Sequence, residues 1–363
     1  MFTDICSLEQ LVRSYKRARI GKRENMSVCA FDFDLESNIE RLHYLLKSGK
    51  YIPSPYTHFT VNEPKTRSIS APAFRDRIVH HSLIKSIEPL FEKKFIIDSY
   101  ACRKKKGTHF GAKRVKKFLM AARCIYGKDQ PLYVLHCDVQ RYYQSINWDV
   151  LFSIITNTIT CPQTCDLIKK IIEHHDSIER KPQNTNAQLG LFSPSSHITP
   201  STVSVAQRKG LPIGNLTSQI FANIYLNELD QYVKKALHEK WYTRYMDDFL
   251  IIHTDKEHLK KVREDIRIFL RENLKLTLHP KKIAIKNVTQ GVTFVGYRIF
   301  YDHTLIKGET LIRLQRKYRG RRKQFFQRKI TKSQMKMSNA SVRGHLKHAD
   351  THNLWANLCN KRI

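Results

Sequence analysis

Two adjacent carboxylates, Asp247 and Asp248, have the residue types and spacing most suited to chemistry in this sequence. The apolar run from Phe249 to Ile252 follows them, which predicts a tight turn between two buried strands. Like charges repel there, so the pair needs cations, and Mg²⁺ suits it because it prefers carboxylate and phosphate oxygens. An ordinary hairpin turn is the alternative explanation for these residues taken alone.

A third carboxylate, Asp138, ends the strand-like run PLYVLHCD. Aspartates at the ends of adjacent strands could hold two metal ions about 4 Å apart. One ion would activate a primer 3′-hydroxyl, and the other would stabilise the departing pyrophosphate. The three aspartates therefore predict a metal-dependent phosphoryl-transfer site.

The elements expected to position these residues alternate between helices and short strands. Residues 1–50 have helical periodicity, residues 51–70 have the character of short strands, and residues 75–95 are helical again. The text RYMDDFLIIH predicts two strands around an acidic turn, and VTFVGYRIF predicts a later strand pair. Further helices are expected at WDVLFSII and over residues 216–237, 259–274 and 310–363. Residues 177–207 are polar and predict an insertion loop.

The charge balance points to a polyanionic partner. Lys and Arg total 64 against 32 Asp and Glu, a net charge of +32, so nucleic acid is the expected ligand. We find no apolar run of about 20 residues and no signal peptide, which argues against a membrane. The eight cysteines show no metal-binding spacing beyond the close pair Cys161 and Cys165. They are interpreted as reduced thiols of a cytoplasmic protein.

Five motifs, in order along the chain, resemble those of reverse transcriptases. DVQRYY at 138–143 and YMDD at 245–248 resemble the two catalytic motifs of that family. GLPIGNLTSQ at 210–219 resembles its template-and-nucleotide motif. HPKK at 279–282 and FVGY at 294–297 resemble its lysine motif and primer grip. The resemblance covers about residues 50–300.

This resemblance implies an α+β right-hand polymerase fold, with fingers, a palm built on an antiparallel sheet, and a helical thumb. The domains would be an N-terminal helical extension at 1–50, fingers and palm at 51–300, and a basic thumb at 301–363. The implied activity is RNA-directed DNA synthesis with two Mg²⁺ ions, for which Mn²⁺ could substitute. The implied partners are an RNA template, a DNA primer or cDNA product, and dNTPs.

The resemblance also suggests roles around the nucleotide. Tyr143 would occupy the space of a ribose 2′-hydroxyl and so select deoxynucleotides, although a core tyrosine is the alternative. Lys65, Arg67 and Arg75 would clamp the triphosphate, or else form a solvated basic face. Lys282 would protonate pyrophosphate or contact the triphosphate, although the adjacent Lys281 leaves the register open.

Other residues are expected to contact nucleic acid. Gly214 would let the backbone approach a base or sugar, unless it is a simple turn glycine. The primer grip would consist of Phe294, Gly296 and Tyr297. Cations of a basic loop and of the C-terminal helix would bind phosphates, unless they only face solvent: Arg103, Lys104, Lys105, Arg316, Arg319 and Arg322. Histidines at 345, 348 and 352 are expected to pack rather than to bind metal.

Ile213 and Gln219 replace the Gln and Pro that most reverse transcriptases carry. The pattern resembles enzymes of diversity-generating retroelements, which copy RNA with frequent errors at adenines and use a small basic accessory protein. Loss of a polar contact at Ile213 would weaken discrimination. Defence-associated enzymes, which make DNA on a structured noncoding RNA during phage infection, share much of this motif set. Both branches stay open.

Two further alternatives are disfavoured. An inert RNA-binding scaffold would have lost catalytic carboxylates, whereas all three are present in this sequence. An RNA-templated RNA polymerase is disfavoured by Tyr143. No zinc-like thiol cluster, HNH-like segment or RNase H-sized domain is found, so integration and template removal are expected to need host factors.

Overall fold

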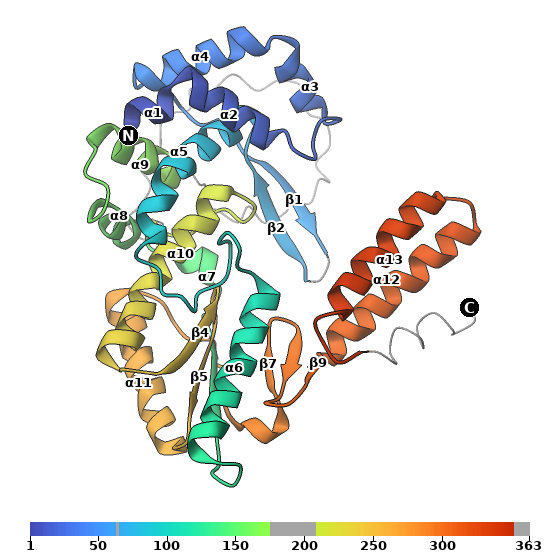
Figure 1. Cartoon of the computed structure of the whole chain (residues 1–363). Coiled ribbons are helices and arrows are strands. Elements are labelled where there is room, and N and C mark those ends of the chain that lie inside the picture. The colour runs from blue at the N-terminus through green and yellow to red at the C-terminus, as the bar shows by residue number, and fades with distance from the viewer. Residues whose placement is uncertain (63–64, 175–207, 352–363) are drawn as a thin grey trace, which may run out of the picture. The chain divides into compact units, whose positions relative to one another are not determined.

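The computed structural model describes residues 1–62, 65–174 and 208–351 (Figure 1). The chain forms two compact units. Unit 1 comprises residues 1–95, 140–228 and 270–277, and unit 2 comprises residues 96–139, 229–269 and those from 278 onward. Each unit combines separate segments, so the domain boundaries expected near residues 50 and 300 stay a prediction. The insertion predicted at 177–207 lies outside the described residues.

Unit 1 begins with the helices predicted for residues 1–50, and they pack together with α5. These helices are α1 (Phe2–Cys6), α2 (Leu8–Ala18), α3 (Met26–Phe33), α4 (Leu35–Lys47) and α5 (Phe74–Glu92). Helices α2 and α4 each bury an apolar face, α2 through Leu11 and Tyr15 and α4 through Ile39, Leu42 and Leu46. The helical periodicity predicted for residues 1–50 is therefore confirmed.

The rest of unit 1 consists of one hairpin and several helices. The hairpin pairs β1 (Thr57–Val61) with β2 (Arg67–Ala71) in antiparallel register, as predicted for residues 51–70. The helices are α7 (Tyr142–Ser145), α8 (Trp148–Thr156), α9 (Pro162–Glu173) and the start of α10 (Leu216–Gln231). The expected helix over 216–237 changes after Gln231 into a π-helical turn, Tyr232–Ala236.

Unit 2 is built on a four-stranded antiparallel sheet with strand order β4-β5-β3-β6. Its strands are β3 (Tyr133–Asp138), β4 (Trp241–Tyr245), β5 (Asp248–His253) and β6 (Ala284–Asn287). The continuous apolar run from Phe249 to Ile252 is fully buried, which shows that both faces of β5 are covered. In the sequence, helix α6 (Thr108–Tyr126) precedes β3, and helix α11 (Lys256–Asn273) lies between β5 and β6.

A three-stranded sheet and a helical hairpin complete the described part of unit 2. The predicted strand pair is β7 (Val292–Phe294) and β8 (Tyr297–Ile299), and β9 (Thr304–Ile306) adds a strand that was not predicted. Helices α12 (Gly308–Phe326) and α13 (Lys332–Leu346) lie side by side (Figure 1). Tyr318 of α12 and Leu346 of α13 join the core cluster that contains Phe294. No helix among the described residues has the length and apolar character needed to cross a bilayer.

Candidate active site

The three predicted carboxylates meet at one end of the four-stranded sheet. Asp138, the last residue of β3, pairs directly with Asp248, the first residue of β5. Tyr245 pairs with Asp248 across β4 and β5, so Met246 and Asp247 form the two-residue turn between these strands. The prediction that these aspartates lie on adjacent strand ends is confirmed. All three belong to unit 2.

The carboxylates lie close enough to affect one another. Burial, the neighbouring Asp138 and then Asp248 raise the pKa of Asp247 to about 6, against the opposing effect of Lys282. Lys282 Nζ contacts both carboxylate oxygens of Asp138, at 2.8 and 2.9 Å. His136 Nε2 contacts Asp248 Oδ1. The site therefore gathers three carboxylates, one of which is paired with the ammonium group of Lys282.

The lysine motif places Lys282 at this position. The backbone N–H of His279 donates to the carbonyl of Asp138 at 2.8 Å, and the N–H of Lys282 donates to the carbonyl of His279 at 3.1 Å. These two bonds fold the HPKK segment back onto the end of β3. Lys282, rather than the adjacent Lys281, is therefore the lysine of this motif that contacts Asp138.

The donor set fits a hard divalent cation, because carboxylate oxygens are the ligands that Mg²⁺ prefers. Burial and then the neighbouring carboxylate of Asp138 raise the pKa of Asp247, and a cation bound beside it would offset both effects. Within the described part of the chain, no three His, Cys, Asp or Glu side chains are grouped closely enough to hold a metal ion as they stand. Lys282 contacts both carboxylate oxygens of Asp138, so a cation that binds Asp138 would have to displace this lysine.

Unit 1 gathers most of the residues predicted to contact the nucleotide. The carbonyl of Tyr143 accepts a hydrogen bond from the N–H of Leu211 at 2.8 Å. The N–H of Ser70, on β2, donates to the carbonyl of Ile213 at 3.1 Å. Backbone bonds therefore link the segment after Asp138, the glycine-rich motif and the β1–β2 hairpin. Gln219 is half-buried on α10, and nothing in the structure tests its role.

Gly214 is required by packing as well as by conformation. Its φ is +115°, and a Cβ there would lie 2.8 Å from Ile69 Cγ2. We expect Gly214→Ala to lower the free energy of unfolding by about 2–4 kcal/mol, from backbone strain plus overpacking. Gly49→Ala is the matched control, since Gly49 has φ +69° but no atom near its Cβ position. It should cost only about 1 kcal/mol.

Urea denaturation of the two variants and the parent protein measures this difference. The double variant Gly214→Ala/Ile69→Ala should recover the steric part, because Ile69 Cγ2 is removed. Equal destabilisation by the two glycine substitutions would show that Ile69 imposes no constraint on position 214.

The three cations predicted to clamp the triphosphate differ in their surroundings. Lys65 and Arg67 are exposed, so their side chains are accessible to a triphosphate and the predicted role stays a prediction. Arg75 Nη2 instead donates to the carbonyl of Ile52 at 2.8 Å, and its Nε contacts Asp76 at 3.4 Å. The structure therefore gives Arg75 contacts that hold residues preceding β1 against α5.

The predicted primer grip is a two-residue hairpin turn. Phe294 pairs with Tyr297, and the intervening Val295 and Gly296 have φ values of +45° and +89°. Positive φ at both turn positions is the signature of a type I′ turn. The side chains of Phe294 and Tyr297 are buried in the core, with 1% and 0% of their surface exposed. A primer contact by this motif would have to come from the turn residues Val295 and Gly296, which are partly exposed.

The predicted phosphate-binding cations also differ. Arg103 Nη1 donates to the carbonyls of Ile96 and Ser99 at 2.6 and 2.7 Å, so it holds its own loop together. Lys104 and Lys105 are exposed on that loop. On α12, Arg316 and Arg319 are exposed, whereas Arg322 lies over the Phe326 ring at 5.8 Å.

The C-terminal histidines pack, as expected, within the described residues. His348 stacks on His109 with ring centroids 3.8 Å apart, and His345 stacks on Tyr297 at 5.5 Å. Tyr297 contacts His109 Nδ1 at 2.9 Å. His352 lies outside the described residues.

Sequence reasoning missed three polar residues around the carboxylates. His136 contacts Asp248, and Arg244 forms a fully buried ion pair with Asp230. A signal was present for Arg244, because it interrupts the aromatic strand text WYTRY immediately before the acidic turn. A buried arginine requires a carboxylate partner, although the sequence does not say which one.

Known proteins resemble this chain over much of its length. Residues 59–299 match the family described as Reverse transcriptase (RNA-dependent DNA polymerase). Protein YkfC of Escherichia coli is 28% identical over 290 residues, which cover 70% of this chain and 69% of YkfC. The group II intron-encoded protein LtrA of Lactococcus lactis is 22% identical over 329 residues, covering 73% of this chain and 50% of LtrA.

Solved structures give a more distant likeness. Apo telomerase from Candida tropicalis has a TM-score of 0.49 at 13% identity, covering 77% of this chain and 54% of that protein. A form truncated at its C-terminal domain has a TM-score of 0.48 at 15% identity, covering 74% of this chain and 59% of that one. The present chain thus spans about half to two thirds of most of these proteins.

Proposed function

Because this chain belongs to the reverse transcriptase (RNA-dependent DNA polymerase) family, we propose that it synthesises cDNA on a dedicated RNA template. Its partners would be the RNA template, a DNA primer or the cDNA product, and dNTPs. The family uses divalent metal ions. The observation that carries the proposal is the direct pairing of Asp138 with Asp248, beside the turn that holds Asp247.

The proposed metal-binding residues lie at one end of the four-stranded sheet. Asp138, Asp247 and Asp248 would hold two Mg²⁺ ions, with Mn²⁺ as a substitute. When bound, these ions would activate the primer 3′-hydroxyl and stabilise the pyrophosphate leaving group. Lys282 carries a positive charge at Asp138 and would turn to the triphosphate once a cation replaces it there.

A primer-extension assay tests this function. The purified chain, Mg²⁺, dNTPs and a DNA primer annealed to RNA should give products whose sequence follows the template. The same preparation treated with EDTA should give none. Product formation that ignores the template, or none with any RNA in Mg²⁺ or Mn²⁺, would contradict the proposal.

Metal-dependent activity should weaken in acid. The pKa of Asp247 is raised to about 6, so this carboxyl is ionised at pH 7.5 and largely protonated at pH 5. Because protons compete with the cation, the Mg²⁺ concentration for half-maximal activity should rise about tenfold per pH unit below about 6 and stay flat above 7. Mg²⁺ titrations of primer extension from pH 5 to 8 measure this. Binding of labelled primer–template at each pH controls for substrate affinity, and a profile without a bend near pH 6 would count against it.

For the biological role, we infer a diversity-generating retroelement, supported by Ile213 and Gln219 within the motif GLPIGNLTSQ. An apolar side chain at 213 removes a polar contact, which fits error-prone copying. The alternative is defence-associated synthesis on a noncoding RNA. Sequenced products with errors concentrated at template adenines favour the first role, and a neighbouring accessory gene with a variable repeat would agree. Faithful copying of one adjacent noncoding RNA favours the second.

A further inference from the structure

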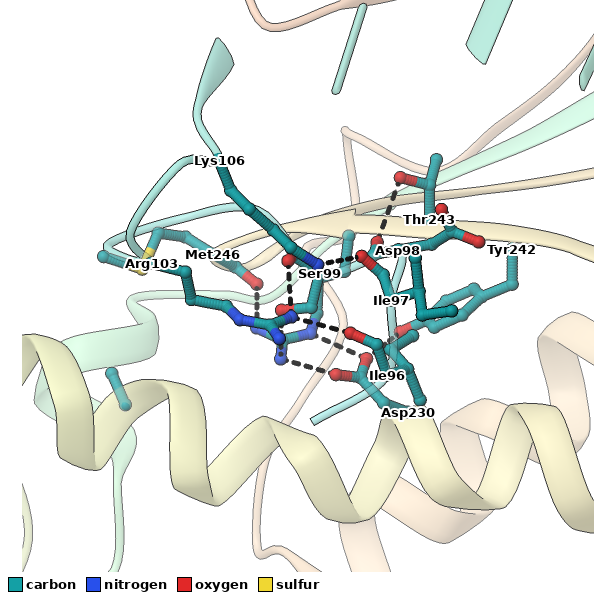
Figure 2. Close-up of polar contacts among 12 residues, drawn as sticks. Ile96, Ile97, Asp98, Ser99, Arg103, Lys106, Asp230, Tyr242, Thr243 and Met246 are labelled. Carbon is teal, nitrogen blue, oxygen red and sulfur yellow. Dashed lines mark hydrogen bonds and ion pairs between the residues drawn. The ribbon is translucent and has the colours of Figure 1, made fainter. Parts of the chain in front are cut away.

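A fully buried ion pair lies directly behind the catalytic turn. Arg244 and Asp230 both have 0% of their side-chain surface exposed. Arg244 Nε donates to Asp230 Oδ1 at 2.7 Å, and Nη2 donates to Oδ2 at 2.6 Å, so the contact is bidentate. Figure 2 labels Asp230, Ser99 and Met246, the residues around this guanidinium. The Tyr242 hydroxyl also donates to Asp230 Oδ1 at 2.6 Å. Such a pair is strongly oriented, because a planar guanidinium matches a carboxylate along two parallel bonds.

The same guanidinium also reaches the turn itself. Arg244 Nη1 donates to the carbonyl of Met246 at 3.0 Å, and Nη2 donates to Ser99 Oγ at 3.2 Å. The Met246 carbonyl belongs to the peptide group that links Met246 to Asp247. Arg244 therefore fixes the orientation of the peptide from which the Asp247 side chain starts.

The strand register places Arg244 away from the reacting groups. Arg244 pairs with Phe249, whereas Asp248 pairs with Tyr245 and Asp138. Because side chains alternate along a strand, Arg244 lies on the face opposite to Asp248 and Asp138. Its observed link to the acidic turn is instead the hydrogen bond to the Met246 carbonyl.

The turn needs such support, because Met246 has a φ of +57°. The left-handed region is strained for a non-glycine residue and persists only where surrounding contacts determine it. The backbone of Arg244 is itself fixed on its outer side. Its N–H donates to the carbonyl of Asp98 at 2.9 Å, and its carbonyl accepts from the N–H of Tyr100 at 3.1 Å. The strand, the guanidinium and the turn are thus tied together.

Stability alone does not account for this arrangement. Replacing a buried ion pair by apolar residues of similar volume is often neutral or stabilising. Since the pair adds little that packing could not supply, its specific feature is the bond to the Met246 carbonyl. We propose that Arg244, oriented by Asp230, is a positioning residue that fixes the Met246–Asp247 peptide and thereby aims the metal-binding carboxylates. This inference rests on the proposed polymerase function.

Two variants remove the bond to the turn in different ways. Arg244→Lys keeps the charge beside Asp230, but one ammonium group cannot reproduce the fork to Asp230 together with the bond to Met246. Arg244→Met with Asp230→Leu replaces the whole pair by apolar side chains, so no unpaired charge is left buried. Tyr242→Phe is the matched control, because it removes one bond to Asp230 and leaves Arg244 on Met246.

The readouts are binding of Mn²⁺ alone, followed by its electron paramagnetic resonance signal, and single-nucleotide extension. Partners that orient metal ligands typically contribute about 10–100-fold to metal affinity or activity. We expect both Arg244 variants to weaken Mn²⁺ binding and lower kcat by about that factor, with KM for dNTP changed less than about threefold. Tyr242→Phe should stay within about threefold of the parent protein on both measures.

The outcomes separate this inference from the function on which it rests. Folded Arg244 variants that bind Mn²⁺ and extend primers like the parent protein would overturn the positioning role. A parent protein that binds Mn²⁺ but extends no primer would overturn the proposed function, while a loss of Mn²⁺ binding in the variants would still support the positioning role. Circular dichroism and thermal unfolding of each variant establish that it is folded.

Discussion

Replacing Asp138 by Asn should lower the rate constant for nucleotide addition at least about a thousandfold, a loss of about 4 kcal/mol of transition-state stabilisation. The asparagine keeps the size of the side chain but removes the charge that pairs with Lys282 and lies beside Asp247 and Asp248. A neutral amide is a poor ligand for a hard cation beside phosphates. Single-turnover extension with saturating primer–template and dNTP measures the rate constant.

The same substitution should leave the fold intact. Removing the charge of Asp138 relieves its repulsion of Asp247 but also removes the ion pair with Lys282, so the two effects on stability oppose one another. Asp129→Asn is the matched control, because Asp129 is exposed in the loop before β3 and should retain full activity. More than a tenth of the parent rate in a folded Asp138→Asn protein would remove Asp138 from the metal site.

Local sequence patterns were enough to predict the frame of this site. The α+β right-hand polymerase fold expected from the motifs is confirmed. The apolar runs before Asp138 and after Asp248 predicted strands β3 and β5. A strand with both faces covered is built from consecutive apolar residues, which makes it visible in the sequence. Strand β9 (Thr304–Ile306) was missed because it stands alone between polar residues. Strands β7 and β8 are equally short, but they share the longer apolar run VTFVGYRIF.

Long-range polar partners could not be predicted in the same way. The chain offers many acids to Arg244, and only the folded path from α10 through the π-helical turn to β4 selects Asp230. The burial of Phe294 and Tyr297 could not be predicted either, because it depends on packing against segments that are distant in the sequence. Both are core residues of unit 2, which leaves the partly exposed turn residues Val295 and Gly296 as the part of the motif that a ligand could reach. Motifs therefore identified the right segments but not which of their atoms are available.

Replacing Tyr143 by Ala should increase the efficiency of ribonucleotide relative to deoxynucleotide incorporation by about 100-fold. The proposal is that the ring fills the space of a 2′-hydroxyl, and a site without that obstruction rejects an added hydroxyl only weakly. The bond between Tyr143 and Leu211 should survive the substitution, because it uses the backbone carbonyl of Tyr143. The ratio of kcat/KM for rNTP and dNTP on one primer–template measures the change.

Tyr143→Phe is the matched control, since it keeps the ring and removes only the hydroxyl. Sugar selectivity should then stay within about threefold of the parent protein, because exclusion is steric and not a matter of hydrogen bonding. If Tyr143→Ala also stays within that range while remaining active, the ring does not face the sugar. Tyr143, half-buried beside Tyr142 at a centroid distance of 5.8 Å, would then be a packing residue of unit 1. Selection against ribonucleotides would have to come from another side chain.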